Sequence, residues 1–254
     1  MKFENTIICG DCLDVMKDLS DECVDLILAD VPYGTTACKW DTIIPLEPMW
    51  KQLKRLIKPN GAIVMTASQP FTTTLIASNM KMFKYCWVWK KTRPVGFLRA
   101  NKEPLRQHED VVVFCIGQSV YNPQRLVACS KQVSRTTQGE NYHPAKSNCY
   151  TQTKTNYPRS IIEIASEGKT VHPTQKPVAL MEYLIKTYTN EGELVLDFAC
   201  GSGTTCKAAQ NLGRRYIGID ISPEYCKIAE ERLRAVDTGV PVKEARAGQQ
   251  ALFE

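Results

Sequence analysis

A run of four residues at positions 30–33, Asp-Val-Pro-Tyr, follows a short apolar stretch and carries groups suited to chemistry on an aromatic amine. The carboxylate of Asp30 can accept a hydrogen bond from one N–H of such an amine, and a main-chain carbonyl beside it can accept the other. Pro32 biases Val31 toward an extended backbone. The ring of Tyr33 offers a face for stacking, worth roughly 1–3 kcal/mol per base. The same run also fits an ordinary turn at a strand end, so by itself it leaves both interpretations open.

A glycine-rich turn at positions 196–205 is the second candidate site, because an apolar strand leads into it and a helix follows. Glycines let the backbone approach a ligand closely, and the helix N-terminus offers unpaired N–H groups. A phosphate-binding loop would need Gly-Lys-Ser/Thr at its end, whereas here Lys207 follows Cys206. Cys206 also replaces the third glycine of a dinucleotide fingerprint, which counts against a nucleotide-dependent oxidoreductase.

Two carboxylates accompany this turn. Asp197 ends the strand before the glycines, and Asp220 ends the next strand along the chain. Asp220 can accept hydrogen bonds from both hydroxyls of a ribose. Asp197, directly or through water, suits the ammonium group of an amino-acid ligand. The pattern therefore favours a nucleoside that carries an amino acid, and the alternative is a strand–turn–helix with capping Asp and Ser/Thr residues.

The elements that must position these residues alternate in type along the chain. Alternation of strands and helices indicates an α/β fold, with a mostly parallel sheet covered by helices on both faces. The apolar patterns predict strands at 6–9, 24–29, 62–67, 83–89, 111–116, 194–196 and 215–220, and helices at 45–57, 71–80, 178–189, 204–212 and 223–235.

Length and charge add a second expectation. The chain has 254 residues, 43% of them hydrophobic, which suits one domain with a sizeable insertion, and the polar stretch 117–168 is the candidate insertion. Residues 84–106 carry seven basic side chains and one acidic one, and residues 119–169 carry seven and three. The first forty residues are acidic instead. This asymmetry predicts a face that meets a polyanion, or a solvated basic surface.

The eleven cysteines are spread over the whole chain, which is typical of reduced thiols rather than a disulfide framework. Cys9 and Cys12 form a single Cys-x-x-Cys without a second pair, so no metal site is predicted. No apolar run is long enough to cross a membrane, and the first residues lack a signal pattern. We therefore expect a cytoplasmic protein.

The order of these motifs resembles that of the beta-class amino DNA methyltransferases. In that family the catalytic tetrapeptide comes first, the target-recognition region second and the glycine-rich cofactor motif last. Here positions 30–33 precede the polar stretch and positions 197–203 follow it, while residues 10–13, 108–114 and 168–177 resemble further family motifs. The family usually has two prolines where this chain has Val31 and Pro32. Since the first of these positions supplies a main-chain carbonyl, we expect an active enzyme.

The resemblance implies a Rossmann-like class I methyltransferase fold, with a seven-stranded, mostly parallel sheet and one antiparallel strand at its edge. It implies S-adenosylmethionine as the methyl donor and a base flipped out of double-stranded DNA as the acceptor. Residues 1–117 would form the catalytic half, 118–168 a target-recognition insertion, 169–238 the cofactor-binding half and 239–254 a polar tail. The implied catalytic residues are Asp30, Val31, Pro32 and Tyr33. The implied cofactor residues are Asp11 and Cys12 near the adenine, Asp220 at the ribose, Thr174 and Lys176 at the methionine end, and Asp197, Phe198, Ala199, Gly201, Gly203 and Thr204 around the turn.

The acceptor base is the least determined part of this interpretation. Asp at the first position of the tetrapeptide is more typical of adenine-N6 methylation in this family, and Ser of cytosine-N4 methylation. Alternatives are therefore a cytosine-N4 enzyme, a catalytically silent DNA-binding homologue and an amino methyltransferase that acts on RNA. The resemblance also allows a homodimer and a cognate restriction enzyme as partners.

Overall fold

A computed structural model describes residues 3–35, 41–135, 148–166 and 175–238. The chain forms two compact units. One comprises Met1–Asn122 together with Ser160–Glu254, and the other comprises Pro123–Arg159. Thr174 and the predicted tail at 239–254 lie outside the described residues.

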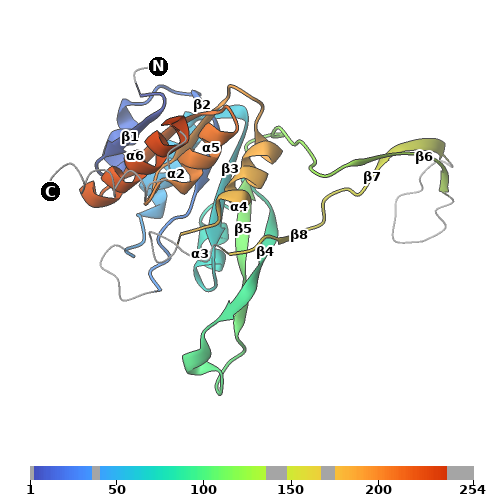
Figure 1. The fold of residues 1–254 in the computed structure, drawn as a ribbon, viewed down its shortest axis with the longest axis horizontal. Coiled ribbons are helices and arrows are strands. Elements are labelled where there is room, and N and C mark those ends of the chain that lie inside the picture. The colour runs from blue at the N-terminus through green and yellow to red at the C-terminus, as the bar shows by residue number, and fades with distance from the viewer. Residues whose placement is uncertain (1–2, 36–40, 136–147, 167–174, 239–254) are drawn as a thin grey trace. The chain divides into compact units, whose positions relative to one another are not determined.

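The larger unit is built on an eight-stranded sheet with the order β1-β10-β9-β2-β3-β5-β4-β8 (Figure 1). Neighbouring strands run parallel except on either side of β5, which is antiparallel to both β3 and β4. The predicted α/β fold with a mostly parallel sheet is thus confirmed. The strands are β1 (Thr6–Cys9), β2 (Val24–Ala29), β3 (Ile57–Ala67), β4 (Phe83–Val95), β5 (Arg106–Phe114), β8 (Ile161–Glu163), β9 (Leu194–Asp197) and β10 (Arg215–Asp220).

Helices cover both faces of this sheet because its central strands bury both sets of alternating side chains. In β2, Leu26 and Leu28 pack among residues of α4, α5 and α6, whereas Ile27 and Ala29 pack among residues of α2 and α3. The helices are α1 (Cys12–Val15), α2 (Leu46–Leu56), α3 (Phe71–Ser78), α4 (Val178–Tyr188), α5 (Thr204–Asn211) and α6 (Pro223–Thr238), with 3-10 turns η1 (Met16–Asp18) and η2 (Phe97–Arg99).

The sheet differs from the expected one in two ways. It has an eighth strand, β8, whose three residues sit inside a polar stretch and bury only Ile162, so periodicity alone gives no sign of it. The antiparallel strand β5 is not at the edge as the resemblance implied, because β4 and β8 continue the sheet beyond it.

Three element boundaries also differ from the sequence-based prediction. Helix α2 ends at Leu56, and Pro59-Asn60-Gly61 then lies within β3 rather than between helix and strand. The pairing register of β2 and β3 shifts between Val24 and Leu26, which accommodates this irregular stretch. Strands β4 and β5 are longer than expected and begin or end in exposed, charged sequence.

The smaller unit contains an antiparallel pair, β6 (Val127–Arg135) and β7 (Asn148–Thr155). It lies within the predicted insertion at 118–168 but is shorter, because β8 pairs with β4 of the main sheet. Among the described residues, no helix is long and apolar enough to cross a membrane.

Candidate active site

Polar residues from five strands meet at one edge of the main sheet. Asp30 follows β2, Asp197 ends β9 and Asp220 ends β10, and these parallel strands point their carboxyl ends in the same direction. Strand β5 runs the opposite way, so Glu109 near its start reaches the same edge as Thr66 near the end of β3. Ligands of open α/β sheets bind at such an edge.

A cavity of about 760 Å³ opens at this edge. It lies entirely in the larger unit, and six acidic and three basic residues are among the described residues that line it. Thirteen of the predicted site residues line this one cavity: Asp11, Cys12, Asp30, Val31, Pro32, Tyr33, Lys176, Asp197, Phe198, Ala199, Gly201, Thr204 and Asp220. Gly203 does not line it, and Thr174 lies outside the described residues.

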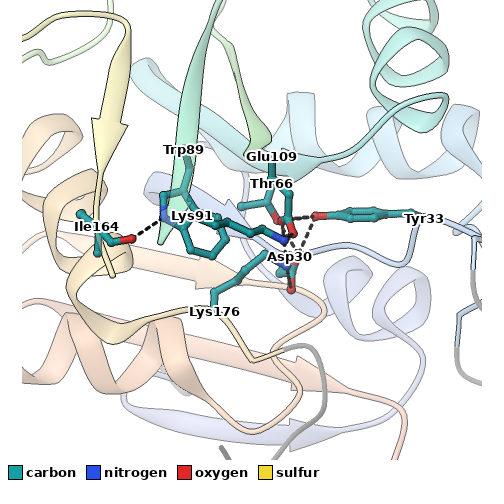
Figure 2. Close-up of polar contacts among 8 residues, drawn as sticks. All are labelled: Asp30, Tyr33, Thr66, Trp89, Lys91, Glu109, Ile164 and Lys176. Carbon is teal, nitrogen blue, oxygen red and sulfur yellow. Dashed lines mark hydrogen bonds and ion pairs between the residues drawn. The ribbon is translucent and has the colours of Figure 1, made fainter. Parts of the chain in front are cut away.

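Three side chains hold the carboxylate of Asp30 (Figure 2). The Thr66 hydroxyl donates to Oδ1, and the Tyr33 hydroxyl lies 2.9 Å from the same oxygen. The ammonium of Lys176 lies 2.7 Å from Oδ2. A carboxylate offers about four acceptor positions. The described residues therefore leave room for one further N–H donor on Oδ2.

Lys176 also reaches a second carboxylate. Its Nζ lies 3.3 Å from Oε2 of Glu109, and the other oxygen of Glu109 pairs with Lys91 on β4. Burial opposes the charge of Lys176, but the nearby carboxylates of Asp30 and Glu109 outweigh it and raise the pKa of the ammonium. The two lysines and two carboxylates thus form a partly buried cluster whose formal charges cancel (Figure 2).

The ring of Tyr33 contacts both an aromatic side chain and a charged one. It stacks on Phe71 with centroids 5.5 Å apart and an interplanar angle of 21°, and Nζ of Lys176 lies 5.6 Å from its centroid. Burial, followed by the charges of Asp30 and Glu109, raises the pKa of the Tyr33 hydroxyl well above its usual value. The hydroxyl therefore stays protonated and acts as a hydrogen-bond donor at neutral pH.

The segment after the tetrapeptide is held by a residue without a predicted role. Asp41 is buried, and its two carboxylate oxygens accept the backbone N–H groups of Gly34 and Thr35 at 2.8 and 2.9 Å. Val31 itself is buried in the core beside α2 and α3. The valine that departs from the usual family pattern is therefore used for packing.

The glycine-rich turn is held from α6. The buried guanidinium of Arg232 donates to the carbonyl oxygen of Ser202 at 2.5 Å, to its hydroxyl at 2.8 Å and to the hydroxyl of Thr204 at 3.2 Å. Gly203 has φ +75°, and a Cβ there would lie 2.8 Å from the Cβ of Ala229 on α6. This glycine therefore lets α6 pack closely against the turn, and it does not line the cavity. Its contact with the cofactor stays a prediction.

Each acidic residue of the turn has a defined environment. Asp197 is buried and its Oδ1 accepts the N–H of Ala199, and burial raises its pKa to about 7. Asp220 accepts the N–H of Gly201 at 2.8 Å and that of Ser222 at 2.9 Å. These bonds orient both carboxylates beside the cavity.

The chemistry of this half of the cavity fits S-adenosylmethionine. At Gly201, φ is +50° and no atom lies within 4 Å of an added Cβ, so the backbone is open to a ligand on that side. The start of α5 lies beside it, and acidic residues outnumber basic ones around the cavity, which favours a ligand with net positive charge. Asp220 would hold the ribose, Asp197 the ammonium, and Asp11 and Cys12 the adenine.

Several known proteins are similar to this chain in sequence or fold. Type II methyltransferase M.HpaI of Haemophilus parainfluenzae is 28% identical over 244 residues, which cover 91% of this chain and 74% of that protein. The crystal structure of the M1.HpyAVI–SAM complex has a TM-score of 0.63 at 27% identity and covers 90% of this chain and 99% of that chain. The cytosine-N4-specific PvuII DNA methyltransferase shares the fold, with a TM-score of 0.67 at 15% identity, covering 89% and 85%.

Together the sheet, the glycine-rich turn and the acidic strand ends define a class I methyltransferase of the S-adenosylmethionine-dependent type. A family model described as DNA methylase, of the N6/N4 type, matches residues 24–231. Because this match spans more than half of the chain, the protein belongs to the N6/N4 DNA methylase family.

Several residues of the site carry no role in the sequence-based prediction: Thr66, Lys91, Glu109, Asp41 and Arg232. The sequence contains a feature that could have pointed to Glu109, since a charged His-Glu-Asp run directly precedes the apolar stretch that forms the buried part of β5. No sequence feature points to Arg232, because a basic residue on a surface helix is ordinarily solvated.

Proposed function

We propose that this protein transfers a methyl group from S-adenosylmethionine to the N6 amine of adenine in double-stranded DNA. The observation that carries this proposal is the carboxylate of Asp30, which three side chains orient and which keeps one acceptor position beside the cofactor half of the cavity. Asp rather than Ser at this position supports adenine as the base.

The donor supplies an electrophilic methyl group on its sulfonium. Asp30 accepts a hydrogen bond from one N–H of the flipped base, and the main-chain carbonyl of Val31 accepts the other. These bonds draw the amine nitrogen toward tetrahedral geometry and make its lone pair available. Holding the amine in line can supply on the order of 7–11 kcal/mol of the barrier.

The proton that the amine loses passes to the carboxylate of Asp30, which lies within hydrogen-bonding distance of it, and from there to solvent. Lys176 balances the charge of this carboxylate and of Glu109 throughout, since it is buried between them. The ring of Tyr33 offers a surface against which the base stacks.

The test is methyl transfer to unmethylated phage DNA with S-adenosylmethionine carrying a labelled methyl group, followed by digestion to nucleosides. We expect the label in N6-methyladenine, and no transfer by an Asp30→Asn variant. Label in N4-methylcytosine would overturn the assignment of the base. No label in any duplex at low salt would overturn the proposed activity, and preferential labelling of structured RNA would assign a different polymer.

A further inference from the structure

Strands β4 and β5 continue past the edge of the main sheet as a two-stranded ribbon (Figure 1). Strand β5 pairs with β3 only from Asp110 onward, and β4 pairs with β8 only as far as Lys90. The pairing of β4 with β5 nevertheless extends to Val95 opposite Arg106. Residues 91–108 therefore form an outer ribbon whose strands, among the described parts of the sheet, pair only with each other.

The tip of the outer ribbon is apolar and exposed. Leu98 is 104% exposed, Phe97 is 67% exposed and Val95 is 43% exposed. Gly96 has φ +99°, a left-handed turn that leads into the short 3-10 turn bearing Phe97 and Leu98. Exposed apolar side chains that follow one another at the end of a ribbon make this tip a candidate interaction site.

The charge of the outer ribbon indicates which kind of partner it binds. Arg93, Arg99, Lys102 and Arg106 of the outer ribbon are all exposed, and Glu103 is the one acidic residue in this segment. Glu103 pairs with Arg99 at 3.2 Å, which leaves a strong excess of positive charge. This excess suits a polyanion and disfavours the same surface of a second copy.

The outer ribbon is continuous with the active site. Lys91, Arg93 and Val95 line the cavity, so the ribbon leads from the cavity to Phe97 and Leu98 at its tip. Phe97 lies six positions after Lys91. These six steps reach roughly 20 Å at about 3.3 Å per residue. At about 3.4 Å per base step, a duplex that runs along the ribbon would pass the tip about six base pairs from a base held in the cavity.

We propose that the outer ribbon grips the DNA substrate, with Lys102, Arg106 and Arg99 against phosphates and Phe97 and Leu98 inserted into a groove. Apolar Phe and Leu side chains are used in this way by proteins that pack against base edges and steps. The inference rests on the proposed function, since it assigns the partner of the same site.

The apolar part is tested by a Phe97→Ala/Leu98→Ala double variant acting on unmethylated phage DNA. We expect the KM for DNA to rise about tenfold, which corresponds to about 1.4 kcal/mol, with kcat at saturating DNA and the affinity for S-adenosylmethionine changed by less than about threefold. The matched control is Met80→Ala/Ile116→Ala, which removes exposed apolar side chains near the opposite ends of β4 and β5.

The charged part is tested by the salt dependence of binding to a mixed-sequence 40-base-pair duplex. The Lys102→Ala/Arg106→Ala variant should lower the slope of log K against log salt by about 1.8, since each phosphate contact contributes about 0.9. The Lys186→Ala/Lys227→Ala variant, on α4 and α6, should leave the slope unchanged.

A photo-crosslink distinguishes the occupants. Benzoylphenylalanine in place of Leu98 should crosslink to the duplex, about six base pairs from the methylated base. A crosslink to a second copy of the chain, or to anionic lipid vesicles in preference to DNA, would overturn the proposal. If the wild-type enzyme methylates DNA while both ribbon variants behave like it, the ribbon assignment alone is wrong. A wild-type enzyme that methylates no DNA contradicts the proposed function instead.

Discussion

Lys176 and Asp30 are 146 positions apart in the chain and lie in contact, with 2.7 Å between Nζ and Oδ2. The lysine precedes α4 and the aspartate follows β2, so this pair joins the two ends of the site. A buried ion pair contributes little to stability by itself, but loss of one partner leaves an uncompensated charge. The contact therefore fixes the orientation of the carboxylate more than it stabilises the fold.

Replacement of Asp30 by Asn should abolish methyl transfer while leaving the cofactor half of the cavity intact. The amide can no longer accept both the amine N–H and the proton that it loses. We expect a fall in single-turnover rate of at least about 100-fold, the scale seen when one preorganised electrostatic group is lost. Binding of S-adenosylmethionine, measured by calorimetry, should stay within a few-fold. A rate within threefold of wild type would remove Asp30 from the mechanism.

Glu109→Gln should change the pH dependence of the reaction. Burial lowers the pKa of Lys176, but Asp30 and Glu109 raise it above its usual value. Without the Glu109 charge this pKa falls, so Lys176 loses its proton at a lower pH. We expect the alkaline limb of the kcat profile to move to lower pH.

The matched control for Glu109 is Glu163→Gln on β8, an exposed carboxylate that pairs with Lys90 outside the cavity. Its pH profile should match that of the wild type. If the two Gln variants have the same pH profile, the cluster of Asp30, Glu109, Lys91 and Lys176 does not set the protonation of the site.

The site residues that could be identified from the sequence share one property: the neighbouring residues alone show where each lies in the sheet. Asp30, Asp197 and Asp220 each follow an apolar run, and the carboxyl ends of parallel strands meet at one edge whatever the details of pairing. Their convergence on one cavity could therefore be predicted without coordinates.

The partners of Asp30 depend on pairing that the sequence does not reveal. Glu109 reaches this edge because β5 is antiparallel, and Lys91 reaches Glu109 because Trp89 lies opposite Glu109 in the pairing of β4 with β5. A shift of one residue would turn both side chains to the other face. Arg232 is equally hidden, since its burial is set by the packing of α6 on the glycine-rich turn.

Affinity for S-adenosylmethionine should rise with pH through the titration of Asp197. Burial raises the pKa of this carboxyl to about 7, so the charged form that would hold the ligand's ammonium becomes dominant only above neutrality. The amino group of the ligand stays protonated below about pH 7.7. From pH 6 to 7.5, Kd should fall about five- to tenfold.

Asp197→Asn should weaken binding and flatten this profile. The same shift has a consequence for folding, since a carboxyl whose pKa is raised in the folded state binds protons more tightly there than in the unfolded chain. Its contribution to the free energy of unfolding therefore declines as pH rises from about 4 to about 7. A wild-type Kd independent of pH in this window would place the ammonium away from Asp197.

Arg232→Met should weaken cofactor binding without affecting the binding of DNA. The guanidinium donates to Ser202 and Thr204, and the methionine keeps most of the buried volume while losing these bonds. We expect the Kd for S-adenosylmethionine to rise by about tenfold or more, as for the loss of one or two buried hydrogen bonds to a charged group. The KM for DNA at saturating cofactor should be unchanged, and an unchanged cofactor affinity would show that the turn holds its shape alone.

Alanine at Gly203 should mainly lower stability, whereas alanine at Gly201 should mainly weaken cofactor binding. Both glycines have positive φ, +75° and +50° respectively. Each substitution carries the cost of a left-handed backbone, about 1–2 kcal/mol. At Gly203 the new Cβ would also lie 2.8 Å from the Cβ of Ala229, which adds roughly 1–3 kcal/mol of overpacking. At Gly201 it meets no atom within 4 Å, and this residue lines the cavity that we propose holds the ligand. Urea unfolding should therefore show Gly203→Ala as the less stable variant, whereas calorimetry should show Gly201→Ala as the weaker binder of S-adenosylmethionine, and the reverse order in either measurement would contradict this division of roles.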